Sequence, residues 1–180
     1  QARGPLPEEV ADLRTAQDSA VRAAVLRVLA QHRHPQALQW LRAGLGDSDL
    51  TVRLAAIEGL GRWGGPDSCE LLRPLLQDHT ERIRAAAVHA LAQADDQQAV
   101  FRAAGDSSWR VRQAVAEALT HYPTRAGQEL ALRLLKDSAA PVPAAVLRAI
   151  RNWPLAQAGP VLLEAMAREV LWIRQEGAAQ

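Results

Sequence analysis

The chain has 180 residues, of which 48% are hydrophobic and 23% charged, a composition that suffices for an ordinary globular core. Its 21 basic and 20 acidic residues give a net charge of +1, which excludes a strong overall attraction to nucleic acid or anionic membranes. The single cysteine, Cys69, excludes an internal disulfide, and no apolar run approaches the roughly 18 residues that a membrane span requires. We expect a cytoplasmic protein without membrane association, while cysteine usage alone leaves a periplasmic location open.

A short phrase recurs through the chain at nearly constant spacing. It opens with a β-branched residue, followed by Arg in all copies but one, at intervals of 31, 31, 28, 31 and 31 residues. The copies begin at Val21-Arg22, Val52-Arg53, Ile83-Arg84, Val111-Arg112, Val142-Pro143 and Ile173-Arg174. Asp stands five positions earlier in four copies, and Ala three positions later in five. A fixed period of this kind indicates a repeat protein, in which each unit packs against its neighbours.

Each repeat predicts a pair of helices. In the second copy Val52, Ala55, Ala56, Gly59 and Leu60 follow the spacing of one helix face. A shorter second helix is predicted, after Pro or Gly punctuation, at 36–45, 67–76, 125–135 and 155–167. The units are roughly 10–33, 34–63, 64–93, 94–122, 123–153 and 154–180. No segment alternates with period two, so the predicted fold class is all-α.

Two units depart from the pattern. The third interval is three residues shorter than the others, which predicts a stunted second helix within QADDQQAVFRAAGD, residues 93–106. In the fifth unit Pro143 takes the place of the repeated Arg. Because proline donates no hydrogen bond, any contact that the Arg makes elsewhere should be missing at this position.

The core Asp-x-x-x-x-Val-Arg-x-x-Ala-x-x-x-x-Leu resembles the short HEAT-like repeat of phycobilin-lyase-type proteins, over roughly residues 10–176. The resemblance implies a right-handed α-solenoid of about six helix pairs, forming a single domain over 1–180. It also implies a ladder in which turn Asp residues accept hydrogen bonds from Arg of adjacent repeats, since a half-buried Arg needs acceptors. The predicted ladder residues are Asp47, Arg53, Asp78, Arg84, Asp106 and Arg112.

The two ends suggest that more chain belongs to this protein. The sequence starts without Met, and its last unit stops abruptly after LWIRQEGAAQ. Solenoids need polar capping repeats to end in water. We therefore expect the chain to be part of a larger protein, with other domains of the same polypeptide among its candidate partners.

No catalytic constellation is found in the sequence. His32 and His34 flank an Arg at a predicted helix junction, where a solvated turn explains them better than a metal clip. Cys69 opens a second helix and is more typical of packing than of a reactive thiol. The HEAT-like hydroxylase of deoxyhypusine carries paired His-Glu dipeptides, and none occurs here. We expect a protein that is not an enzyme and holds no metal and no cofactor.

The resemblance implies that the first helix of each pair lines the concave face of the solenoid. On a helical wheel the exposed stripe of these helices carries small apolar residues bordered by six Arg and two Glu, about +4 in charge. Trp109 lies in a turn, where an exposed ring would anchor a partner, whereas Trp40, Trp63 and Trp153 are expected in the core. The predicted partner-binding residues are Arg27, Leu54, Glu58, Arg62, Arg82, His89, Trp109, Arg110, Gln113, Glu117, His121, Arg148 and Arg151.

This stripe predicts a scaffold that binds a partner protein or peptide through its concave face. An apolar centre with charges of both signs suits a protein partner, in which aromatic and Arg side chains act as anchors. Binding of DNA to a moderately basic face is an alternative, weakened by the two interrupting Glu. A second alternative is an accessory subunit of a chromophore lyase-type enzyme.

Overall fold

The computed structural model describes residues 13, 15–32 and 36–177, with side chains placed up to residue 168. The predicted start of the first unit at residue 10, the junction at His34 and the side chain of Arg174 lie outside the described residues. Every regular element in this part of the chain is a helix, which confirms the all-α prediction. The chain divides into two compact units, Gln1–Val100 and Phe101–Gln180, and each is described by itself. That 1–180 form a single domain stays a prediction.

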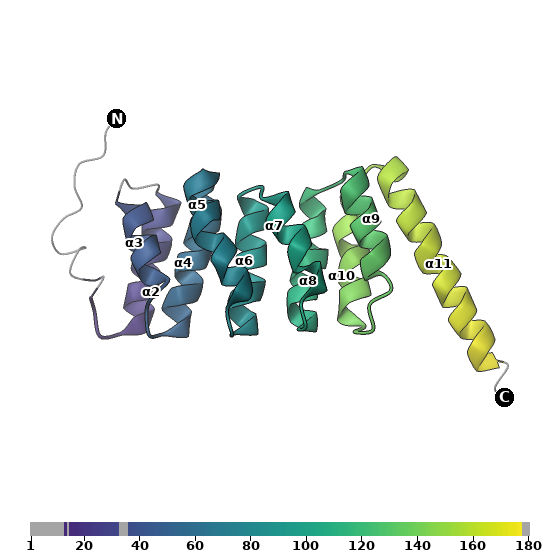
Figure 1. The fold of residues 1–180 in the computed structure, drawn as a ribbon, viewed down its shortest axis with the longest axis horizontal. Coiled ribbons are helices and arrows are strands. Elements are labelled where there is room, and N and C mark those ends of the chain that lie inside the picture. The colour runs from purple at the N-terminus through teal and green to yellow at the C-terminus, as the bar shows by residue number, and fades with distance from the viewer. Residues whose placement is uncertain (1–12, 14, 33–35, 178–180) are drawn as a thin grey trace. The chain divides into compact units, whose positions relative to one another are not determined.

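The first unit consists of helices in two sets, which Figure 1 shows in chain order. The first helix of each pair is termed an inner helix, and the inner helices here are α2 (Ser19–Gln31), α4 (Leu50–Trp63) and α6 (Glu81–Gln93). The second helices are termed outer helices, here α3 (Ala37–Gly44) and α5 (Gly65–Leu72), which continues as the 3-10 turn η1 (Arg73–Gln77). Helix α4 packs against both α2 and α6.

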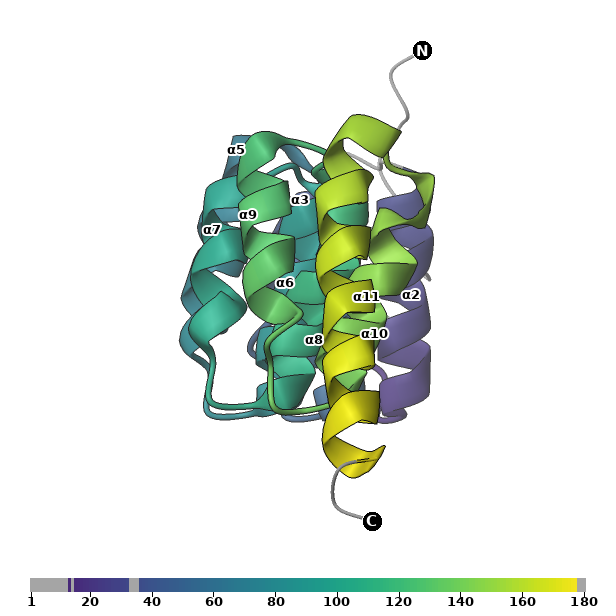
Figure 2. The ribbon, with the colours of Figure 1, turned by 90° about the vertical axis from the view of Figure 1, so that its right-hand side faces the viewer.

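The second unit repeats the arrangement. Its inner helices are α8 (Trp109–Ala118), which ends in η3 (Leu119–His121), and α10 (Pro141–Ala149), which ends in η4 (Ile150–Asn152). Its outer elements are η2 (Ala103–Gly105), α9 (Arg125–Leu134) and α11 (Leu155–Gly177). The inner helices α8 and α10 pack together, and α9 lies beside α11 (Figure 2). The predicted short helix of the third repeat is confirmed, because α7 covers only Gln97–Arg102.

Two predicted helix boundaries are wrong for physical reasons. The helix predicted at 67–76 changes to 3-10 geometry at Arg73, because Pro74 has no N–H to donate to the preceding turn. The helix predicted to end at residue 167 continues as α11 to Gly177. Arg168 stands where earlier repeats carry their turn Asp, so the residue that ends the preceding outer helices is missing there.

Small residues let neighbouring inner helices approach closely. Ala55 and Gly59 on α4 are fully buried, as are the larger Ile57 and Leu60 on the same helix. A Cβ atom added to Gly61 would lie 2.7 Å from Cα of Ala90 on α6. The spacing of α4 and α6 is therefore set by backbone contact rather than by interlocking long side chains. Trp40 and Trp153 are buried as expected, whereas Trp63 is only half-buried.

Gly61→Ala should lower the free energy of unfolding by about 1–3 kcal/mol, because the new Cβ meets backbone that cannot rotate aside. Gly105→Ala is the matched control, since nothing lies within 4 Å of its added Cβ, and it should change stability by less than about 0.5 kcal/mol. Urea denaturation measures both variants. Equal effects would contradict backbone contact between α4 and α6.

Candidate functional site

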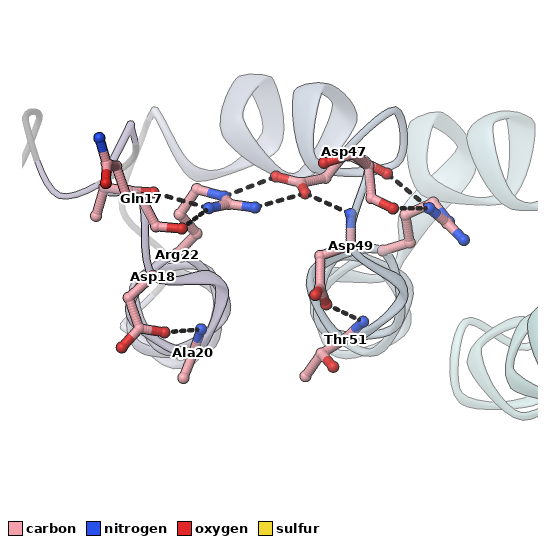
Figure 3. Close-up of polar contacts among 10 residues, drawn as sticks. Gln17, Asp18, Ala20, Arg22, Asp47, Asp49 and Thr51 are labelled. Atoms are coloured by element: carbon pink, nitrogen blue, oxygen red, sulfur yellow. Dashed lines mark hydrogen bonds and ion pairs between the residues drawn. The ribbon is translucent and has the colours of Figure 1, made fainter.

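The turns before α2, α4, α6 and α8 are each built around the arginine of their own repeat. In the first unit Arg22 donates from Nε and Nη2 to the two carboxylate oxygens of Asp47, at 2.9 and 2.8 Å (Figure 3). Its Nη1 donates to the backbone carbonyls of Ala16 and Gln17, at 2.7 and 2.9 Å. One guanidinium thus joins the turn before α2 to the turn before α4, in the bidentate geometry that favours arginine over lysine.

The carboxylate of Asp47 also shapes its own turn. It accepts a hydrogen bond at 2.9 Å from the backbone N–H of Asp49, and Asp49 in turn caps α4 by accepting from the N–H of Thr51 at 2.7 Å (Figure 3). Both bonds satisfy amides at the start of a helix that have no intrahelical acceptor. Asp47 therefore couples the start of α4 to the preceding repeat.

The same arrangement occurs in the second unit. Arg112 donates from Nε and Nη2 to Asp137, at 2.6 and 2.9 Å, and from Nη1 to the carbonyls of Asp106 and Ser107. The carboxylate of Asp137 accepts from the N–H of Ala139 at 2.9 Å. The Arg112 and Asp137 side chains are only 18% and 8% exposed, so this pair is shielded from solvent more than a typical surface salt bridge.

The pairing is not uniform along the repeats. Arg53 donates to the carbonyls of Asp47 and Ser48, but within the described residues it makes no bond with Asp78. The Asp78 carboxylate instead accepts from the N–H of Thr80 at 2.7 Å. Arg84 donates to the carbonyls of Asp78 and His79 before its own helix. Arg22 and Asp137 are missing from the predicted ladder, although the repeat register that selected the other ladder residues places both in the same positions.

Asp47 and Asp137 both have a lowered pKa. In Asp47 the main cause is the hydrogen bond from Arg22, and in Asp137 it is the hydrogen bond from Arg112, each opposed by burial. A lowered pKa means that the folded state stabilises the ionised form of the carboxylate more than the unfolded state does. These two residues thus link folding to pH in the acidic range.

The predicted partner-binding residues of the first unit lie on the inner helices, and most are exposed. Glu58 on α4 accepts from Nη2 of Arg62, one turn later, at 2.7 Å. Nε of Arg27 on α2 lies 3.6 Å from the other carboxylate oxygen of Glu58. The three side chains, each 42–48% exposed, form a charged cluster across two adjacent inner helices. Arg82, at the start of α6, is exposed but does not join this cluster.

A hollow of about 250 Å³ lies between α4 and α6 in the first unit. Its lining residues are Leu54, Glu58, Ala86, His89, Ala90 and Gln93. Leu54, Glu58 and His89 are among the predicted partner-binding residues, and Ala86, Ala90 and Gln93 are not. Ala86 and Ala90 stand at the repeat positions of Ala55 and Gly59, and their short side chains leave room beside Leu54. Small residues that bring helices together thus also open the hollow.

The second unit carries a related cluster on its inner helices. Gln113 Nε2 donates to Glu117 Oε1 at 2.7 Å within α8, and Nη2 of Arg148 on α10 lies 3.8 Å from the same oxygen. Arg151 and His121 are exposed near the ends of these helices. Trp109 is half-buried, and the guanidinium of Arg110 lies 4.6 Å from its ring centre, in a cation–π contact. Trp109 is therefore engaged within its own turn.

A larger cavity lies among the outer helices of the first unit. It measures about 720 Å³ between α3 and α5, and its lining residues are Leu38, Gln39, Arg42, Asp67, Glu70 and Leu71. This cavity was not predicted from the sequence, because the predicted binding residues all came from the exposed stripe of the inner helices. It offers a partner a second surface on the opposite set of helices.

The described residues offer little for metal or thiol chemistry. Among them, no three His, Cys, Asp or Glu side chains are grouped so as to hold a metal ion. Cys69 is buried beside the carbonyl of Ala94, and burial raises the pKa of its thiol, which favours the unreactive protonated form. No helix in this part of the chain is both long and apolar enough to cross a membrane.

Residues 7–92 match the family model of HEAT repeats. This part of the chain, just under half of its length, is similar to HEAT repeats. The match agrees with the resemblance noted in the sequence, and the helix pairs of both units agree with an α-solenoid of this type. Among curated proteins, no relative of the sequence is found.

Three solved structures are similar to this chain in fold. The complex of CpcE and CpcF of phycocyanin lyase from Nostoc sp. PCC7120 gives a TM-score of 0.61 at 20% identity, covering 83% of this chain and 66% of that chain. The S. pombe condensin Cnd3–Cnd2 subcomplex gives 0.64 at 18% identity, covering 89% and 24%. Human deoxyhypusine hydroxylase in complex with glycerol gives 0.53 at 21% identity, covering 79% and 60%. The chain thus spans two thirds or less of each of them, and the likeness is one of fold.

Asp137→Asn should lower the free energy of unfolding by about 1–3 kcal/mol at neutral pH, because a shielded charge-assisted pair is lost. The folded-state pKa of Asp137 is lowered, so its contribution is present above the ordinary carboxyl pKa of about 4 and is lost as pH falls through the lowered value. The variant should therefore lose less stability in acid than the parent protein does. Denaturation across an acid series measures this.

Asp78→Asn is the matched control for this prediction. Asp78 occupies the same repeat position and its turn bond from Thr80 can be kept by an amide oxygen, but it has no bond to Arg53. It should change stability by less than about 0.5 kcal/mol. If both variants lose the same stability, the bond from the arginine is not what stabilises these turns.

Proposed function

We propose that this chain is a non-catalytic scaffold that binds a segment of a partner protein on the exposed face of its inner helices, the concave face of the solenoid. The observation that carries the proposal is the hollow between α4 and α6. Leu54, Ala86 and Ala90 give it an apolar floor, and Glu58 and His89 supply polar groups at its edge. An apolar centre with a polar rim is the usual anatomy of a protein-binding surface.

The placement of charges across the inner helices supports an extended partner. In each unit a charged side chain approaches the residue at the same repeat position on the next inner helix, Arg27 with Glu58 and Glu117 with Arg148. Equivalent positions of neighbouring helices therefore lie side by side, and a segment running across the helices would meet them in turn. Because helices already hold these side chains, binding costs little ordering of the scaffold.

The similar structures support a protein partner only through the fold. Two of them are complexes between protein chains, CpcE with CpcF and Cnd3 with Cnd2. Since fold alone does not fix function, the partner of this chain is inferred from its own inner face. Another protein, or another segment of the same polypeptide, would satisfy the proposal equally.

DNA binding and a role beside a chromophore lyase are supported less well. Strong binding to duplex DNA requires a run of phosphate contacts, and Glu58 and Glu117 lie among the arginines of the inner helices. The lyase alternative rests on the likeness to CpcE and CpcF at 20% identity, and no described residue points to a chromophore.

Leu54→Glu should abolish binding of the partner, because it places a charge on the floor of the hollow. The purified chain and this variant are used as bait in lysate of the source organism, and the retained proteins are identified. We expect the variant to lose proteins that the parent chain retains. Its helicity, measured by circular dichroism, should stay unchanged.

Leu71→Glu is the matched control, since Leu71 is also half-buried and lines a cavity, but between outer helices α3 and α5. It should retain the same proteins as the parent chain. Loss of binding in Leu71→Glu alone would contradict the proposal and move the site to the outer cavity.

A further inference from the structure

The charged clusters of the two units follow one pattern. Glu58 and Glu117 occupy the same repeat position, and each has a hydrogen-bond partner one turn away on its own helix, Arg62 or Gln113, at 2.7 Å. A guanidinium from a neighbouring inner helix then approaches the same carboxylate, Arg27 at 3.6 Å and Arg148 at 3.8 Å. The pattern recurs although the pairing arginine comes from the preceding helix in one unit and from the following helix in the other.

The contacts of the two Glu within their own helices are short, and their contacts with arginines of neighbouring helices are long. A separation of 2.7 Å is a short hydrogen bond between charged or polar groups, whereas 3.6–3.8 Å exceeds the usual N–H···O range. The Arg27 side chain is 46% exposed and that of Arg148 is 64% exposed. Exposed ion pairs of this kind contribute little to the stability of a protein. Arg27 and Arg148 can therefore exchange a Glu for another carboxylate at small cost.

The charge balance favours a negative partner. In the first cluster Arg27 and Arg62 face one carboxylate, Glu58, which leaves a net charge of 2 − 1 = +1. A carboxylate from a partner would complete the cluster, whereas a basic side chain would add a third cation next to two others. The planar guanidinium fork matches a carboxylate in a bidentate manner.

The cluster and the hollow share one residue. Glu58 lines the hollow and is also the carboxylate beside Arg27 and Arg62. An apolar side chain seated on Leu54 and Ala86 therefore places the adjoining residues of its segment next to these two arginines. Glu58 interrupts the run of phosphate contacts that duplex DNA requires, whereas a single carboxylate beside Arg27 requires no such run.

We propose that the partner segment is acidic, with an apolar side chain seated in the hollow between α4 and α6 and a carboxylate bound by Arg27. This inference rests on the proposed function and specifies the chemistry of the partner at the same face. The proposal excludes basic segments as partners, whereas the mixed charges of the sequence alone are compatible with them.

The test uses short random peptides displayed on phage and selected on the immobilised chain, with enriched sequences then synthesised and measured by fluorescence anisotropy. We expect the enriched peptides to carry Asp and Glu in excess of Lys and Arg, around at least one apolar residue. Arg27→Gln should weaken their binding about fivefold to twentyfold, as expected for loss of a charge-assisted bond. Arg27→Lys should restore part of it, because the charge returns without the fork.

Arg42→Gln is the control, since Arg42 is exposed and lies in the outer cavity instead. It should change binding less than about twofold. Enriched peptides that are neutral or basic, or equal losses in Arg27→Gln and Arg42→Gln, would overturn the acidic-segment proposal while leaving a protein-binding face in place.

Failure of the proposed function gives different results. Peptides that bind equally to the chain and to Leu54→Glu would show that the hollow is not their site. Absence of any enriched peptide would overturn both proposals. A random-sequence DNA duplex that binds more tightly than the peptides, with steep loss as salt rises, would overturn both in favour of nucleic acid.

Discussion

The bond between a repeat arginine and the turn aspartate of the next repeat joins the two helix pairs that carry the charged clusters, α2 with α4 and α8 with α10. Arg22 and Arg112 each hold two carbonyls before their own helix and the carboxylate before the next inner helix. These hydrogen bonds fix where two neighbouring inner helices begin relative to each other along their axes. Equivalent positions then come side by side, as the contacts of Arg27 with Glu58 and of Glu117 with Arg148 demonstrate.

The close packing of α4 and α6 explains both the stability of this surface and its hollow. Gly61 lies against the backbone of Ala90, so the helices approach at one point as far as their atoms allow. Ala86 and Ala90 fill little of the space beside Leu54, and the hollow opens there. Lengthening one of these side chains would therefore close the hollow or push the helices apart. The same small residues serve packing and leave room for a partner.

Much of the fold could be predicted from the sequence, because a repeat is decided by its period. The 31-residue spacing and the short third interval were enough to predict helix pairs and a shortened second helix, which is α7. Helix ends depend on single residues, and the period alone predicted two of them wrongly. Pro74 changes the end of α5 to 3-10 geometry, and α11 continues past Arg168, where earlier repeats carry Asp.

The candidate site was harder to predict, because it depends on distances that the repeat does not determine. Asp78 and Arg53 stand in ladder positions but do not bond to each other. The repeat could not show that Glu58 is bound at 2.7 Å within its own helix while Arg27 stays at 3.6 Å. It also could not reveal the outer cavity, because that space results from the lateral spacing of α3 and α5.

The central claim is that a partner binds the inner helices rather than the outer ones, and site-specific photo-crosslinking tests it most directly. A photoreactive amino acid is placed at Gln93, an exposed residue of the inner hollow, or at Gln39, an exposed residue of the outer cavity. After irradiation with the bound partner, the account predicts a covalent adduct from position 93 and none from position 39. An adduct from position 39 alone would contradict it.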